Sequence, residues 1–196
     1  MWNERFAEPD FTYGKEPNDF LASLNLSEFE GQVMCLAEGQ GRNAVYLAGL
    51  GFEVTAVDLS DVGLARTQEL AAERGVEVHT LQADLGIFTL EAASVDGVVM
   101  IFGHTPRHIR AHIHREIIKG LKPGGFFVLE GYRKEQIAYK TGGPSVDGML
   151  YSLEELLEDF GESMEWRLAQ NQEREVVEGA YHNGLAAVVQ LFGTKR

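Results

Sequence analysis

Apolar and polar residues follow one another along this chain in a pattern that predicts alternating strands and helices. Short runs of apolar and β-branched residues indicate buried strands, and they lie at 32–36, 53–58, 76–81, 95–102 and 126–129. Between these runs, apolar residues recur at helical spacing, as they do at Ile109, Ile113 and Ile117.

Residues that favour helix ends support the same division. Gly51 is a plausible end of the helix that starts near Arg42. Ser60 can cap the next helix, and Gly75 can close it. Pro106 suits the first turn of a further helix, where its missing N–H costs nothing.

The last third of the chain changes character. The run 152–155, Ser-Leu-Glu-Glu, is a capping box that opens one more helix. Two strands follow, at about 164–177 and 185–192, with Gly179 to Gly184 between them. Because consecutive strands with a short link pair antiparallel, these two should form a hairpin.

Strands that alternate with helices predict a parallel sheet with helices on both faces. The predicted fold class is therefore α/β: a Rossmann-like, doubly wound, seven-stranded, mostly parallel sheet with a C-terminal antiparallel hairpin. No low-complexity tract or long linker divides the chain, so we expect residues 1–196 to form a single domain. Residues 1–20 are rich in aromatic side chains, and Trp2 and Tyr13 are candidates for a lid over a site.

Composition and charge narrow the classes of partner. The chain carries 30 acidic and 17 basic residues, a net charge of −13, which would repel nucleic acid and anionic lipid. No apolar stretch approaches membrane-spanning length, and the start lacks the features of a signal peptide. The single cysteine, Cys35, cannot form an internal disulfide, which suits a cytoplasmic protein. We expect a monomer or homodimer.

A glycine-rich turn follows the first predicted strand, in the run Gly39-Gln40-Gly41. A strand that turns sharply into a helix leaves backbone N–H groups unpaired at the helix start, and these suit an anionic or polar ligand. Glycines let such a ligand approach the backbone closely. The alternative is an ordinary tight turn between a strand and a helix.

Two acids fall where the next strands end. Asp58 ends the second strand and can accept both hydroxyls of a ribose. Asp84 follows the third strand and can accept an exocyclic amine. Since ligands of such sheets lie at the carboxyl ends of the strands, an adenosine-type ligand is predicted there. The alternatives are a helix cap for Asp58 and an Asx turn for Asp84.

These features carry a resemblance to a known family. The order of elements, Gly39-x-Gly41, Asp58, Asp84 and the turn 122–125 resemble a class I S-adenosylmethionine-dependent methyltransferase. The segments 13–21 and 38–44 are similar to the small bacterial tellurite-resistance and thiopurine methyltransferases. The resemblance implies S-adenosyl-L-methionine as cofactor, with its contacts at Glu38, Gly39, Gly41, Arg42, Asp58, Leu59, Ala83, Asp84 and Gly103. Arg42, at the helix start, is a candidate to hold a carboxylate of cofactor or substrate.

The first motif departs from the family pattern Asp-x-Gly-x-Gly-x-Gly. Cys35 stands at the acid position and Ala37 at the first glycine, while Glu38 supplies an acid three residues after Cys35. The question is whether Glu38 takes over the work of the usual acid, which orders the loop and helps to hold the methionine amino group. Ala37 is tolerable there if its φ is negative.

The acceptor side is less well defined. His104, after the fourth strand, is the candidate catalytic residue, with a structural helix-entry histidine as the alternative. Tyr132, Tyr151 and His182, with the lid residues above, are candidates for the substrate pocket. A thiolate or selenide acceptor would need no base, whereas an oxygen or nitrogen acceptor would. His108 and His112 have zinc-ligand spacing, but a solvated helix face explains them better, so no metal site is predicted.

The predicted function is methyl transfer to a small-molecule acceptor, such as a thiol, an amine or a chalcogen compound. One alternative is a non-catalytic protein that binds S-adenosylmethionine or S-adenosylhomocysteine. A second is a nucleotide-dependent reductase, since Ala44 fits the third position of a dinucleotide fingerprint. The short chain and its C-terminal hairpin favour S-adenosylmethionine over a dinucleotide.

Overall fold

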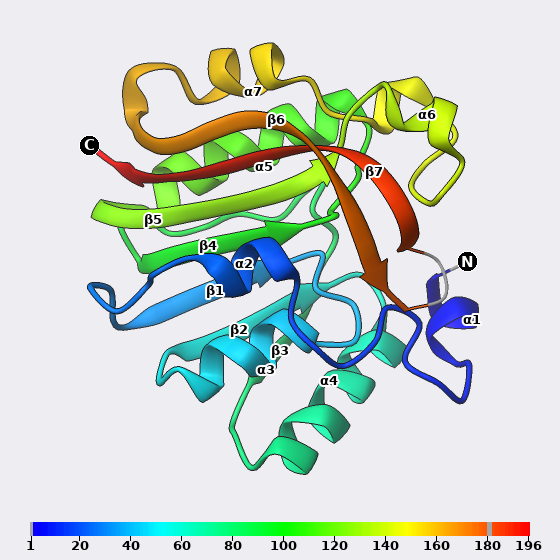
Figure 1. Cartoon of the computed structure of the whole chain (residues 1–196). Helices are drawn as coiled ribbons and strands as arrows, with labels where there is room; N and C mark the ends of the chain where they lie inside the picture. The colour runs from blue at the N-terminus through cyan, green and yellow to red at the C-terminus, as the bar shows by residue number, and fades with distance from the viewer. Residues whose placement is uncertain (1, 180–181) are drawn as a thin grey trace.

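A computed structural model describes residues 2–179 and 182–196. Its centre is a seven-stranded sheet in the order β3-β2-β1-β4-β5-β7-β6 (Figure 1). Strands β1 to β5 pair in parallel, and β7 pairs antiparallel with both β5 and β6, so that β6 and β7 form the hairpin that the sequence predicts. The strands are β1 (Gln32–Leu36), β2 (Glu53–Asp58), β3 (His79–Gln82), β4 (Val95–Ile101), β5 (Leu121–Tyr132), β6 (Met164–Glu178) and β7 (His182–Lys195).

Helices cover both faces of this sheet. The main ones are α3 (Arg42–Gly49), α4 (Asp61–Arg74), α5 (Arg107–Gly120) and α7 (Leu153–Phe160). Short helical turns complete the chain: α1 (Trp2–Phe6), α2 (Asp19–Ser23), α6 (Gln136–Tyr139), η1 (Asp147–Met149) and η2 (Gly161–Ser163). No described helix is long and apolar enough to span a membrane.

Alternation along the strands divides the core into two layers. Val33 and Cys35 of β1 point into the layer built with α2, α3 and α4, whereas Leu36 points into the layer built with α5 and α7. Side chains on successive strand residues face opposite sides of a sheet, so a strand that is apolar on both faces is covered on both faces.

Two predicted features, the turn at 122–125 and the capping box at 152–155, differ in the structure. Residues 122–125 bulge out of β5, because its pairing with β4 passes from Leu121 directly to Phe126. The helix α7 begins after Ser152 as predicted, but the Ser152 side chain makes no capping bond. Glu155, the other half of the expected capping box, lies instead 3.6 Å from both Arg110 and Lys134.

The backbone of Ala37 does not meet the condition under which an alanine is tolerable here, which is a negative φ. Its φ is +53°, in the left-handed region. Ala37 occupies the first turn residue after β1, and the family pattern places glycine there. A Cβ in this conformation is unfavourable by about 1–2 kcal/mol.

A buried cluster of charged and amide side chains ties the hairpin to the rest of the molecule. Glu130 of β5 is fully buried and accepts hydrogen bonds from Asn18, Arg174 and Gln190 at 2.6–2.9 Å. Arg174 also contacts Glu178 at 3.2 Å. The cluster joins the N-terminal segment to β5, β6 and β7.

We expect Ala37→Gly to stabilise the fold by about 0.5–1 kcal/mol, because glycine adopts a positive φ without the Cβ penalty. Urea unfolding measures the change. The control is Ala65→Gly on the exposed face of α4, where glycine should lower stability by about 1 kcal/mol. A loss of stability in both variants would contradict the assignment of strain to Ala37.

Glu130→Ala should lower the free energy of unfolding by about 3–5 kcal/mol, because it leaves Arg174 and two amides without their shared acceptor. Chemical denaturation measures this loss. Glu16→Ala removes an exposed ion pair with Arg74 and should have little effect. Similar losses in the two variants would show that the buried cluster contributes no more to stability than an exposed ion pair does.

Candidate functional site

The predicted site residues gather where the parallel strands end. Figure 1 shows α1, the end of β6 and the start of β7 on this same side of the molecule. The site has two parts, a polar part over β1 and β2 and an aromatic part over β4 and β5.

The turn between β1 and α3 is organised by Glu38. One oxygen of its partly buried carboxylate accepts the N–H groups of Asn43 and Ala44, both at 2.9 Å. These are first-turn amides of α3, whose N-cap residue, Gly41, has no side chain to bind them. Glu38 therefore does the loop-ordering part of the work expected of the family's acid. Cys35, at the family's acid position, is fully buried.

Both glycines of the turn are required by their surroundings. Gly39 and Gly41 have φ values of +65° and +88°. A Cβ on Gly41 would lie 2.5 Å from the Thr67 side chain, and one on Gly39 would lie 2.9 Å from the Phe6 ring. The turn is thus packed closely between α4 and the N-terminal segment.

Asp58 links the turn after β2 to the turn after β1. Its two carboxylate oxygens accept the N–H groups of Gly39 and Ser60, each at 2.8 Å. Burial raises the pKa of Asp58, while these amides act in the opposite direction. Each oxygen retains a lone pair, so the carboxylate can still accept from a ligand.

The residues predicted to meet an adenine lie next to Asp58. The Ala83 N–H donates to the Asp58 carbonyl at 3.0 Å, which brings the chain after β3 beside β2. Asp84 is exposed and forms the Asx turn considered above, with the Gly86 N–H at 2.8 Å. Leu59 is 57% exposed. Ile87, 80% exposed, is a further apolar side chain that the sequence reasoning missed.

The N-terminal segment covers the glycine turn. Gln40 accepts the Thr12 N–H at 2.8 Å and donates to the Phe6 carbonyl at 3.4 Å. The Trp2 ring stacks on Phe6 with 5.6 Å between centroids. Of the predicted lid residues, Trp2 and Tyr13 both contact Phe6, and Phe6 is the ring that lies beside Gly39.

Aromatic side chains meet over the ends of β4 and β5. The His182 ring lies 4.5 Å from Tyr13, 4.6 Å from Phe102 and 5.2 Å from Tyr132. We call these four residues the aromatic cluster. Phe102 was not predicted, and its φ of +52° marks it as a strained position. An apolar residue after a strand carries no sequence signal for such a backbone.

His104 has both ring nitrogens engaged. Nδ1 lies 3.0 Å from the Met149 carbonyl, and Nε2 lies 3.1 Å from the Tyr132 N–H. Burial lowers the pKa of His104 to about 4. A role as general base would require one of these two bonds to be given up. The Tyr151 hydroxyl donates to the Gly103 carbonyl at 2.7 Å and fixes the same corner.

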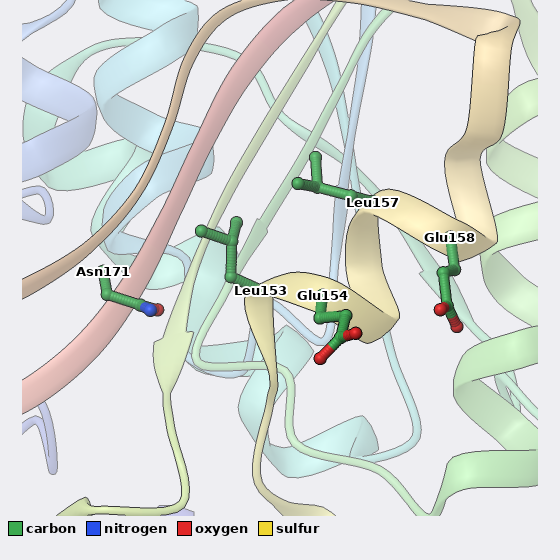
Figure 2. A pocket seen from close by; sticks show the side chains of 5 residues that line it. All are labelled: Leu153, Glu154, Leu157, Glu158 and Asn171. Atoms are coloured by element: carbon green, nitrogen blue, oxygen red, sulfur yellow. The ribbon is translucent and has the colours of Figure 1, made fainter.

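Other features lie away from these residues. The described residues include no group of three or more side chains suited to hold a metal, and His112 contacts the Phe88 carbonyl at 2.8 Å. A surface hollow of about 540 Å³ lies between α7 and β6, and Figure 2 shows the side chains that line it. It is lined by Leu153, Glu154, Leu157, Glu158 and Asn171, none of which was predicted for the site.

Comparison with known proteins agrees with this geometry. Residues 33–125, from β1 into β5, match the family model of a methyltransferase domain. Among curated proteins, none matches the chain.

Solved structures share the fold at low identity. A protein of echinomycin biosynthesis, described for the conversion of a disulfide bond into a thioacetal group, has 19% identity and a TM-score of 0.73, covering 92% of this chain and 83% of its own. An S-adenosylmethionine-dependent methyltransferase from Methanosarcina mazei has 14% identity and a TM-score of 0.70, covering 92% and 98%. TehB from Haemophilus influenzae has 19% identity and a TM-score of 0.66, covering 84% of this chain and 57% of TehB.

The matched domain contains the glycine turn, Asp58 and Asp84, and the remainder of the chain completes the same sheet. Residues 33–125 therefore match a methyltransferase domain, and the chain as a whole has the fold of the S-adenosylmethionine-dependent methyltransferases.

Proposed function

We propose that this protein transfers a methyl group from S-adenosylmethionine to a small-molecule acceptor that binds beside the aromatic cluster. The observation that carries this proposal is the cover formed by the N-terminal segment. Gln40 of the glycine turn binds Thr12 and Phe6, so the segment closes over the strand ends and favours a small acceptor over a polymer. The net charge of −13 also disfavours a nucleic acid.

The polar part of the site fits the cofactor. The left-handed Gly39 and Gly41 keep the turn free of Cβ atoms. We assign the ribose hydroxyls to the Asp58 carboxylate, and the adenine to the exposed face of Leu59 with Ala83 and Asp84. We assign the methionine portion to the turn itself and to Gly103. When bound, the cofactor supplies a methyl group already activated on a sulfonium.

The chain's own residues provide position and a water-poor surface. The rings of Tyr13, Phe102 and Tyr132 offer faces that suit a sulfonium cation. Proximity and alignment supply much of the acceleration in such a displacement. Since His104 is bonded at both nitrogens, we propose that it positions the chain between β4 and β5 and does not act as a base. A site without a base suits a soft acceptor such as a thiolate.

Thermal shift with S-adenosylmethionine and S-adenosylhomocysteine tests the cofactor. Turnover against a panel of thiols, amines and chalcogen oxyanions then separates an enzyme from a non-catalytic binding protein. No stabilisation by either compound at millimolar concentration would overturn the proposal.

Asp58→Asn should weaken S-adenosylhomocysteine binding by about tenfold to a hundredfold, because hydrogen bonds to a charged acceptor are the stronger ones. Isothermal titration calorimetry measures this. Glu77→Gln, which changes an exposed acid just before the amino end of β3, is the control and should bind as the wild type does. Equal affinity in Asp58→Asn would remove Asp58 from the cofactor site.

The raised pKa of Glu38 predicts how the stability of the fold changes with pH. Burial raises its pKa from 4.5 to about 7, against the opposing effects of the Ala44 and Asn43 amides and of Arg42. Between these values the folded protein holds a proton that the unfolded chain has released, so stability falls as pH rises through this window. Glu38→Gln keeps an oxygen for both amides and removes the titration. Its stability relative to wild type should therefore rise by on the order of 2–3 kcal/mol between pH 4.5 and 7.5.

Urea unfolding at several pH values measures the difference between the two proteins. A difference that does not change with pH would show that Glu38 titrates near its usual pKa in the folded state.

A further inference from the structure

Two buried polar atoms at the junction of the two parts of the site have no hydrogen-bond partner among the described residues. They are Nη1 of Arg42 and Nδ1 of His182. Both side chains are only 7% exposed. Buried polar groups are nearly always bonded, so each of these atoms requires a partner from a ligand or from water.

The two side chains belong to one region. The other terminal nitrogen of Arg42, Nη2, binds Glu178 at 2.5 Å. Glu178 stands directly opposite His182 in the β6–β7 ladder. After burial, Arg42 exerts the largest effect on the pKa of His182, and it lowers that pKa. The guanidinium and the imidazole are therefore near enough to interact electrostatically.

Cationic side chains act on His182, although two of them, Arg42 and Arg174, are paired with Glu178. Burial has the largest effect on the pKa of His182, and Arg42, His104, Arg5 and Arg174 lower it further, to about 3. His182 is thus a neutral imidazole at physiological pH. An oxygen anion beside Arg42 could accept from Nη1, the terminal nitrogen that the pair with Glu178 leaves without a partner.

The donors match one chemical group. A guanidinium with one nitrogen already paired can still donate from the other to an oxygen anion. A neutral imidazole in the Nδ1–H tautomer adds a second donor. We propose that Arg42 and His182 form a subsite for a carboxylate group of the ligand bound in the site.

This inference rests on the proposed function, which supplies two sources of a carboxylate. One is the amino-acid tail of the cofactor, and the other is a carboxylate on the acceptor. The rings of Tyr13, Phe102 and Tyr132 around His182 keep water from competing for the donors. The chemistry is the same for both sources, and binding experiments distinguish them.

Two variants remove the donors with little change in shape. Arg42→Lys keeps a positive charge for Glu178 but loses the second edge of the guanidinium. His182→Phe keeps an aromatic ring and loses both nitrogens, and it leaves the Arg42–Glu178 ion pair intact. Arg174→Lys is the matched control, because all three nitrogens of Arg174 already have protein partners.

Calorimetry compares S-adenosylhomocysteine with 5′-methylthioadenosine, which lacks the amino-acid tail. If the subsite holds the cofactor carboxylate, both variants bind S-adenosylhomocysteine about tenfold to a hundredfold more weakly and bind 5′-methylthioadenosine as the wild type does. Arg174→Lys should leave the ratio of the two affinities unchanged.

Benzoate tests the acceptor as the source. If the subsite holds an acceptor carboxylate, millimolar benzoate raises the melting temperature of the wild type and of Arg174→Lys, but not of Arg42→Lys or His182→Phe. The shift is measured with the free protein and with protein saturated with S-adenosylhomocysteine.

The subsite is overturned if Arg42→Lys and His182→Phe match Arg174→Lys in both the affinity ratio and the benzoate shift. Should Arg42→Lys fail to fold, His182→Phe alone decides between these outcomes. Should neither nucleoside bind the wild type, the proposed function fails, and the benzoate shift of the free protein still decides the subsite.

Discussion

The backbone amides after β1 are held by the carboxylates of Glu38 and Asp58, and the geometry of the site depends on them. Asp58 accepts the Gly39 N–H, and Glu38 accepts two first-turn amides of α3. A glycine-rich turn has many accessible conformations, and ordering it costs free energy. Because the protein's own carboxylates meet this cost, the turn is shaped before any ligand arrives.

The buried cluster around Glu130 and Glu178 attaches the N-terminal segment and the hairpin to the start of α3. Asn18 donates to both Glu130 and Glu178, and Arg42 pairs with Glu178. The N-terminal segment, the start of α3 and the hairpin therefore share the same acceptors. Since breaking a buried pair leaves an uncompensated charge, movement of one segment is costly unless the others adjust.

Local signals predicted much of the fold. The bounds of β1 and β2 match the apolar runs, and Ser60 and Gly75 end α4 as expected, because these features involve neighbours in sequence. The Arg42–Glu178 pair joins residues 136 positions apart, and no short pattern announces it. The positive φ of Phe102 and the diversion of Glu155 to Arg110 and Lys134 likewise depend on tertiary packing.

The cover over the glycine turn constrains how a ligand reaches it. The Phe6 ring packs against Gly39, and Gln40 binds the backbone of Thr12 and Phe6. A ligand that touches the turn at Gly39 must therefore displace the Phe6 ring, and in the proposed function residues 2–13 would enclose it. Enclosure removes water from a displacement in which a cation loses its charge, and such a reaction is favoured by apolar surroundings. The segment that limits access to the turn is thus also the one that makes the site suitable for methyl transfer.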